Sequence, residues 1–332
     1  MTGPGRGGRG ARGEQPTVPD AQFRSYYGRP ILKAPVWGHG IPTYFFSGGL
    51  AAGSALLAAG ADLTGRPTMR RSARLVCLGA LGASAGLLVQ DLGRPDRFYN
   101  MLRVAKPTSP MSMGSWILAT ITPAAGLAAA AEFADLLPSR GVLGLARRAL
   151  PPAGRAAGLA AAGVAPALAT YTAVLLADTA APSWHEAYPE LPFVFAGSAL
   201  ASASGAGLLA APPAETAPAR RLALAGAAAE LIASRRIETR LGLLSEPYRQ
   251  GRAGLLLRIS RALTVAGALG ALLGRRSRLV SALSGAALLA ASAATRFGIY
   301  EGGVESMKDP RYTVVPQRQR LDQENQVRAD GT

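Results

Sequence analysis

Apolar blocks of Ala, Leu, Val and Gly alternate with short polar connections from residue 37 to residue 298. Most blocks approach the ~20 residues that an α-helix needs to cross a bilayer. The pattern therefore predicts an all-α, polytopic membrane protein with eight spans, at residues 41–62, 72–92, 112–135, 156–177, 191–211, 221–234, 255–274 and 279–297. The sixth is short and contains Glu230, so a helix shielded by protein and a segment lying in the membrane interface both stay open for it.

Polar segments flank the spans and divide the chain. Residues 1–36 are basic and Gly-rich and lack the apolar core of a signal peptide, so we expect a disordered tail and approach there. Region 37–180 holds the first four spans and region 181–298 the last four, and residues 299–332 are predicted to be a polar C-terminal tail.

The net charge of +16 comes mainly from basic residues that lie between apolar spans. The positive-inside rule and anionic lipid headgroups explain such charges. We therefore expect membrane lipid, and not nucleic acid, as a partner. The two tails and the second, fourth and sixth connections carry more Lys and Arg than the other connections. This favours both termini on the cytoplasmic side of a bacterial plasma membrane, and the reversed topology stays open.

The few potential metal ligands exclude two classes of redox centre. The single cysteine, Cys77, lies inside an apolar span, and the two histidines, His39 and His185, are far apart in the chain. An iron–sulfur cluster needs several Cys ligands, and a haem held between helices needs two histidines at one depth. We therefore expect no haem, no iron–sulfur cluster and no other metal site in this chain.

Small and aromatic residues suggest how the spans pack. Gly49 and Gly53 in the first span, and Gly82 and Gly86 in the second, have the small-xxx-small spacing that allows two helix backbones to approach closely. All three tryptophans fall at predicted span ends, where an interfacial aromatic belt is expected: Trp37, Trp116 and Trp184.

The chain is organised around a polar stretch between the second and third spans, QDLGRPDRFYNMLRVAKPTSPMSMGSW at residues 90–116. Its glycine and prolines cannot continue a helix, which indicates a shaped connection. Charges of both signs gather there and can bind a partner or gate a site: Asp91, Arg94, Asp96 and Arg97, followed by Arg103 and Lys106. A salt bridge and a helix cap within the loop are the structural alternative for Asp91 and Arg94.

At DLGRPDRFYN and KPTSPMSMGSW the chain resembles the NrfD/polysulfide-reductase membrane-subunit family, the quinone-reactive anchors of molybdopterin oxidoreductase complexes. IPTYFFSGGLAAG, ATYTAVLLADTAAPSWHEAYPELPFVFAGSALAS and RFGIYEGGVESMKDPRYTVVPQR extend the resemblance over about residues 26–320, the last being similar to actinobacterial-type members. The resemblance implies eight helices in two four-helix bundles and no cofactor of the chain's own. It also implies a pocket for menaquinone or ubiquinone in the first bundle, near a ferredoxin-like 4Fe–4S subunit that serves a molybdopterin catalytic subunit.

The resemblance places the quinone head near the start of the first span and a tyrosine of the fourth, which here implies His39, Thr43 or Tyr44, and Tyr171. A quinone needs hydrogen-bond donors at its carbonyl groups, a proton carrier and an apolar slot. A solvated interfacial histidine and a tyrosine that only packs are the structural alternatives. The loop residues Asp91, Arg94, Asp96 and Arg97 are expected to dock the partner.

Acids in or beside the spans are costly in lipid and suggest a proton path: Glu132, Asp178 and Glu230. Arg258 and Arg261 are possible partners of Glu230, and a structural ion pair is the alternative. The leading hypothesis is thus a quinone-reactive membrane anchor that exchanges electrons between the quinone pool and an iron–sulfur partner. A transporter or proton-conducting subunit, and a structural anchor without quinone chemistry, remain open alternatives.

Overall fold

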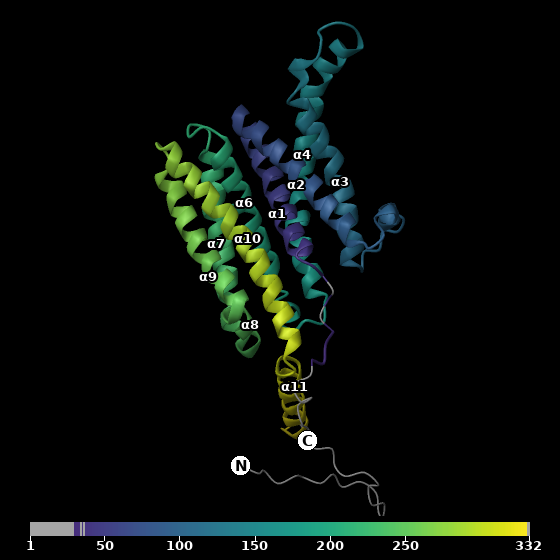
Figure 1. Ribbon diagram of the computed structural model, residues 1–332, viewed down its shortest axis with the longest axis vertical. Coiled ribbons are helices and arrows are strands. Elements are labelled where there is room, and N and C mark those ends of the chain that lie inside the picture. Colours follow the sequence, from purple (N-terminus) through teal and green to yellow (C-terminus); the bar gives the residue numbers. More distant parts are fainter. Residues whose placement is uncertain (1–29, 34, 36, 331–332) are drawn as a thin grey trace, which may run out of the picture.

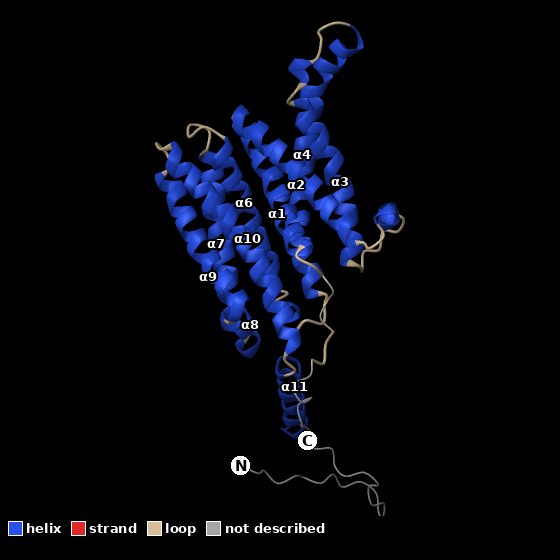
Figure 2. Ribbon diagram, in the orientation of Figure 1, coloured by secondary structure: helices blue, strands red, loops and turns tan. Residues whose placement is uncertain are grey.

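The computed structural model describes residues 30–33, 35 and 37–330, and all regular secondary structure within them is helical (Figure 2). The long helices run roughly parallel to one another, and helix α11 (Arg311–Asp330) extends from one end of this helical layer (Figure 1). The predicted disordered tail lies almost entirely outside the described residues. The all-α fold class is confirmed.

The first group of helices comprises α1 (Gly40–Leu63), α2 (Pro67–Asp91), α3 (Pro110–Ala131) and α4 (Gly141–Ala177). The 3-10 helix η1 (Pro95–Leu102) lies in the central stretch, and η2 (Ala134–Leu136) lies between α3 and α4. Helix α4 includes the Pro/Arg-rich segment that was predicted to be a connection. Its two prolines at 151 and 152 continue the helix, which extends well before the apolar span begins.

The second group comprises α6 (Leu191–Ala210), α7 (Ala217–Arg240), α9 (Gly251–Leu273) and α10 (Arg278–Lys308). Short elements join them at the end of the layer near α11: α5 (Pro182–Glu186), η3 (Gly242–Ser245) and α8 (Glu246–Arg249). The eighth span was predicted to end at residue 297, but α10 continues to Lys308. The region expected to be a polar tail therefore contains the last turns of α10 and most of it is helix α11.

Seven described helices are long and apolar enough to cross a membrane: α1, α2, α3, α4, α6, α9 and α10. The predicted sixth span corresponds to α7, which does not meet this criterion, so the count of eight spans is not confirmed. Yet α7 packs along α6, because Gly226 of α7 and Gly197 of α6 approach each other closely and Arg240 at the end of α7 pairs with Glu190 just before α6. Charged residues, Glu230 among them, lower its hydropathy.

Helix α1 packs on α2 and α4 of its own group and on α6 and α10 of the other, so the two groups pack directly on each other, and a division into two separate four-helix bundles is not confirmed. A Cβ atom on Gly53 would lie 2.2 Å from the Ala199 carbonyl oxygen of α6, and one on Gly49 would lie 2.7 Å from Arg296 of α10. The close approach predicted from these glycines is confirmed. The same prediction for Gly82 and Gly86 is wrong, because nothing lies within 4 Å of a Cβ at either position.

The aromatic residues at the α11 end are only partly a belt. Trp116 is 38% exposed, but Trp184 is fully buried, where its indole nitrogen donates to the Ile299 carbonyl and its ring stacks on Trp37. A membrane-interface role for Trp184 is therefore wrong. Tyr300 donates to the Trp37 carbonyl at 2.6 Å, so α10 holds the approach to α1 in place.

Candidate functional site

A mainly apolar cavity of about 120 Å³ lies within the first group of helices, at the end of the layer near α11. The start of α1, the end of α2, η1, the start of α3 and the end of α4 surround it. Three of its lining residues were predicted from the sequence: Tyr44, Tyr171 and Asp91. The others are Trp37, Ile41, Phe45, Leu88, Leu92, Met101, Met111, Gly114, Ser115 and Leu175. Three residues predicted from separate parts of the sequence thus meet at one cavity.

The two tyrosines of the cavity are buried and contact each other edge to face, with ring centroids 6.4 Å apart. The Tyr171 hydroxyl is buried without a hydrogen-bond partner among the described residues. Such a group is costly to leave unpaired, and most buried hydroxyls in proteins have a partner. The Tyr171 hydroxyl is therefore suited to donate a hydrogen bond to a polar ligand.

The Tyr171 ring packs directly against Gly114, which belongs to the GSW segment of the central stretch. A Cβ atom there would lie 2.4 Å from Cε2 of Tyr171, closer than any real Cβ contact. Only glycine allows this ring position, so the motif and the tyrosine of the fourth span are physically linked. Gly114 was not among the predicted site residues, although its place in the motif was a usable signal.

His39 and Thr43, the other two predicted quinone residues, do not line the cavity. His39 is exposed at the N-cap of α1. Thr43 is half-buried, and its hydroxyl donates to the His39 carbonyl at 2.8 Å, a bond within the first turn of the helix. Of the four candidates, Tyr44 and Tyr171 are brought together and His39 stays at the exposed end of α1.

The central stretch is a folded connection, as predicted. Helix α2 ends because Gly93 adopts a φ of +65°, which favours glycine, and Pro95 starts η1. Ser109 accepts a bond from the Ser112 amide and so caps α3, while the Ser112 hydroxyl donates to the Val104 carbonyl at 2.9 Å. Polar residues of the motif therefore shape the loop.

The charged residues of this loop are exposed, and Asp91 also lines the cavity. Arg97 Nε lies 3.9 Å from a carboxylate oxygen of its neighbour Asp96, and both side chains are more than half exposed. Such a pair contributes little to stability. Within the described part of the chain, Asp91 and Arg94 form no ion pair with each other, so the salt-bridge alternative for them is not supported.

Glu132 lies at the opposite end of the helices, in a network of ion pairs that joins α1 to α4. Its carboxylate accepts from Arg70 at 2.7 Å and from Arg74 at 2.8 Å. Arg70 also pairs with Asp62, which Arg155 of α4 contacts at 3.1 Å. This arrangement gives Glu132 a structural task. Asp178, in contrast, is exposed just after α4.

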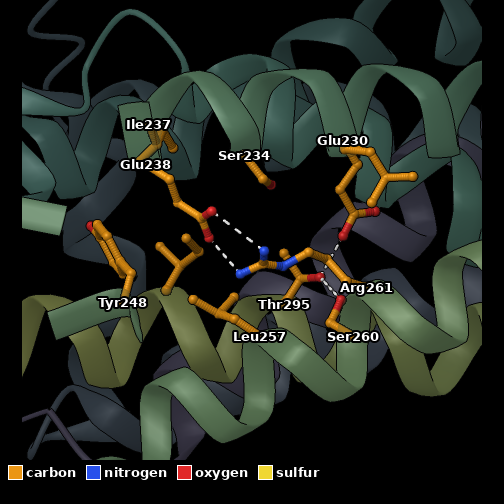
Figure 3. A pocket seen from close by; sticks show the side chains of 11 residues that line it. Glu230, Ser234, Ile237, Glu238, Tyr248, Leu257, Ser260, Arg261 and Thr295 are labelled. Carbon is orange, nitrogen blue, oxygen red and sulfur yellow. Dashed lines mark hydrogen bonds and ion pairs between the residues drawn. The ribbon is translucent and has the colours of Figure 1, made fainter. Parts of the chain in front are cut away.

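Glu230 is 3% exposed and lies in the second group of helices, where α7, α9 and α10 meet. One carboxylate oxygen accepts from the Thr295 hydroxyl, which also hydrogen-bonds Ser260, and the other has no partner among the described residues. Figure 3 shows the hydrogen bonds that join these three residues and, in the same small cavity, the Glu238–Arg261 ion pair. The cavity, of about 20 Å³, has room for a single water molecule.

The expected partners of Glu230 were wrong. Arg261 pairs with Glu238, and Arg258 is exposed. The buried cation near Glu230 is Arg296 of α10, which is 0% exposed and attracts the carboxylate electrostatically. Sequence reasoning missed Arg296, although an arginine inside a predicted span was the available signal.

Arg296 links the second group of helices to the cavity of the first. Its guanidinium donates to the Phe195 carbonyl at 2.7 Å and lies 3.8 Å from the centre of the Phe195 ring. That ring packs at 6.2 Å on Phe45, which lines the cavity. Two guanidinium nitrogens, Nε and Nη1, have no hydrogen-bond partner in the described part of the chain.

No group of three or more His, Cys, Asp or Glu side chains that could hold a metal ion occurs among the described residues. Cys77 is buried in α2. The polar groups of the apolar cavity are hydroxyls and one carboxylate, which suit an organic ligand with carbonyl or hydroxyl oxygens.

The sequence was compared with known proteins. A search of curated proteins finds no match. The family model described as "Polysulphide reductase, NrfD" matches residues 31–221, more than half of the 332-residue chain, and this segment contains every residue of the apolar cavity. With seven helices apolar enough to cross a membrane, the chain is an integral membrane protein, and it belongs to the NrfD family of polysulphide reductase subunits.

Proposed function

We propose that the chain is the quinone-reactive membrane anchor of a molybdopterin oxidoreductase complex in the bacterial cytoplasmic membrane. The observation that carries the proposal is the buried, unpartnered Tyr171 hydroxyl beside an apolar cavity that Tyr44 and Asp91 also line. Menaquinone or ubiquinone presents two carbonyl oxygens on a flat apolar ring. A tyrosine hydroxyl donates to such an oxygen, and the aromatic and aliphatic walls enclose the ring.

The cavity residues divide the chemistry of quinone reduction between them. A quinone takes up two electrons and two protons to become a quinol, and the reverse reaction releases them. Tyr171 orients one carbonyl, and its hydrogen bond stabilises the negative charge that develops on that oxygen. Asp91 stands at the end of α2, where its exposed carboxylate exchanges protons with water and with the ring oxygens. Electrons come from, or go to, the partner protein.

The cavity volume fits a head group better than a whole quinone. About 120 Å³ is similar to the roughly 150 Å³ of an apolar cavity that binds one benzene molecule, so the space suits one ring and not a long tail. Leu92 and Met111, which line the cavity, are 38% and 62% exposed at the surface of the chain. The isoprenoid tail therefore leaves past these side chains into the bilayer.

Quinone binding to the purified chain tests the proposal. Trp37 lines the cavity, so a short-tailed menaquinone is expected to quench tryptophan fluorescence saturably. Gly114→Ala is expected to weaken binding about tenfold or more, because the new methyl group pushes the Tyr171 ring toward the cavity. Gly86→Ala is the matched control, since its Cβ meets nothing within 4 Å. Equal quenching curves for wild type and Gly114→Ala would place the quinone elsewhere.

We further propose that the loop carrying Asp91, Arg94, Asp96 and Arg97 docks a ferredoxin-like 4Fe–4S subunit, which connects to a molybdopterin catalytic subunit. These charges are exposed and lie beside the cavity, where electrons must arrive. Phe98 and Tyr99 are 49% and 58% exposed and add an aromatic contact surface.

Arg97→Glu is expected to release the iron–sulfur partner from detergent-solubilised membranes while the chain still accumulates. Exposed charge contacts weaken as salt rises, because the Debye length is only roughly 8–10 Å near physiological ionic strength. Co-purification of the complex at several salt concentrations measures the effect. Arg148→Glu, exposed at the other end of the helices, is the control. Wild-type partner yield from Arg97→Glu at all salt concentrations would assign docking to another surface.

The predicted proton path rests on Glu230 in this proposal. Of the three predicted acids, Glu132 is held in ion pairs and Asp178 is exposed. Glu230 is buried and forms no ion pair with a described residue, so it is the one available for proton exchange inside the protein. The cavity between Glu230 and the Glu238–Arg261 pair gives it a polar connection toward the α11 end. A proton-conducting subunit is thus the second candidate function.

A further inference from the structure

Six arginines gather at the end of the layer opposite the apolar cavity. They come from three separate connections: Arg66 between α1 and α2, Arg220 and Arg221 at the start of α7, and Arg275, Arg276 and Arg278 between α9 and the first turn of α10. Figure 1 shows these connections at one end of the helices. All six lie outside the seven apolar spans or at their first residue.

Three of these arginines bind backbone carbonyls, Arg278 in the last turn of α6 and Arg66 and Arg220 in the α6–α7 connection that follows it. Arg66 donates to the Ala214 carbonyl at 3.1 Å, Arg220 to the Pro213 carbonyl at 3.3 Å, and Arg278 to the Leu208 carbonyl at 3.1 Å. Cations at a helix C-terminus satisfy its free carbonyls and oppose its dipole. This structural task uses part of their hydrogen-bonding capacity but neutralises none of their charge, because carbonyl oxygens carry no net charge.

The cluster has almost no acidic compensation. Glu215 is the carboxylate on the α6–α7 connection, and it accepts from the Met69 amide. Burial and then the like charges of Arg275, Arg66 and Arg221 lower the pKa of the Arg220 guanidinium, so these four groups are close enough to repel one another. Arg66 Nε is buried without a partner, and the Arg221 and Arg275 guanidinium groups pair with no acid among the described residues.

Exposed leucines border the arginines. Leu63, Leu273 and Leu279 stand within a few residues of Arg66, Arg275 and Arg278 in the chain and are 64%, 78% and 68% exposed. An anionic phospholipid fits both the arginines and the leucines. Its phosphate group accepts hydrogen bonds from the guanidinium groups, and its acyl chains cover the apolar side chains. A free phosphate ion fits only the arginines.

We propose that the cluster Arg66, Arg220, Arg221 and Arg275 binds the phosphate headgroup of an anionic phospholipid, whose acyl chains lie against the neighbouring leucines. The lipid joins the α1–α2, α6–α7 and α9–α10 connections across the end of the layer. It thereby relieves the mutual repulsion of the arginines. The site is separate from the cavity and does not depend on the proposed quinone function.

Native mass spectrometry of the full chain with phosphatidylglycerol or phosphatidylcholine tests the inference. We expect retained phosphatidylglycerol adducts in the wild type and roughly 10- to 30-fold weaker binding in the double variant Arg221→Gln/Arg275→Gln, given the contribution of each basic residue at an anionic surface. Both residues are exposed, so the change should not unfold the chain. The matched control is Arg140→Gln/Arg148→Gln, two exposed arginines at the α3–α4 side of the same end.

Thermal unfolding gives a second readout: phosphatidylglycerol should raise the unfolding midpoint of the wild type and of the control more than that of the cluster variant. Equal loss of adducts in both double variants would mean a diffuse charge effect and overturn the site. Equal retention of phosphatidylcholine, or displacement of the lipid by millimolar glycerol phosphate, would overturn the assignment to an anionic lipid.

Discussion

Tyr171→Phe is expected to lower quinone-dependent turnover about 10- to 100-fold while leaving the chain folded and assembled. The substitution removes one hydroxyl that has no partner among the described residues, so it costs no internal hydrogen bond. The ring stays seated on Gly114. The loss comes from the missing hydrogen bond to a quinone oxygen that becomes charged during the reaction. Quinol titration of the intact complex in membranes measures it.

Two further variants separate the site from general effects. Tyr99→Phe, on an exposed loop residue, should leave turnover unchanged. His39→Ala is expected to lower the maximal rate more than the quinone affinity, because His39 lies outside the cavity lining and can only supply protons from the exposed end of α1. Normal turnover in Tyr171→Phe would remove the tyrosine from the reaction.

Arg296→Met is expected to destabilise the chain severely, by about 3–5 kcal/mol, since it leaves the buried Glu230 carboxylate without its nearby cation. It also removes the contact of the guanidinium with the Phe195 ring and carbonyl. Thermal unfolding in detergent and the amount of chain in membranes measure the effect. The double variant Arg296→Met/Glu230→Gln should recover much of the loss, because both buried charges are then absent.

Arg258→Met on the exposed face of α9 controls for the loss of a basic residue and should be close to neutral. If the double variant is no more stable than Arg296→Met, the two groups are not coupled, and Arg296 acts only through Phe195. Glu230→Gln with unchanged stability but lower proton uptake would support the proton-path proposal separately.

The elements of the candidate site differ in how far sequence could locate them. The family resemblance pointed to Tyr44 and Tyr171, and the charges of the central stretch pointed to Asp91; all three line the cavity. Gly114 and Trp37 complete the cavity, but their part depends on which helix faces which, and no local pattern encodes that. The partner of Glu230 was missed for the same reason, since Arg261 lines the same cavity but pairs with Glu238, and Arg258 is exposed.

The sequence alone determined the helical class, the apolar segments that the seven candidate spans occupy, and the break between α2 and α3. Bilayer length, hydropathy and the backbone limits of Gly93, Pro95 and Pro110 are local properties of the chain. Tertiary structure decided which small residues form helix contacts: Gly53 packs against Ala199, whereas Gly82 and Gly86 meet nothing. It also decided which charged residues are buried and which residues they contact, because both depend on the facing helix. Arg296, which lies between α1, α6 and α7, is the example.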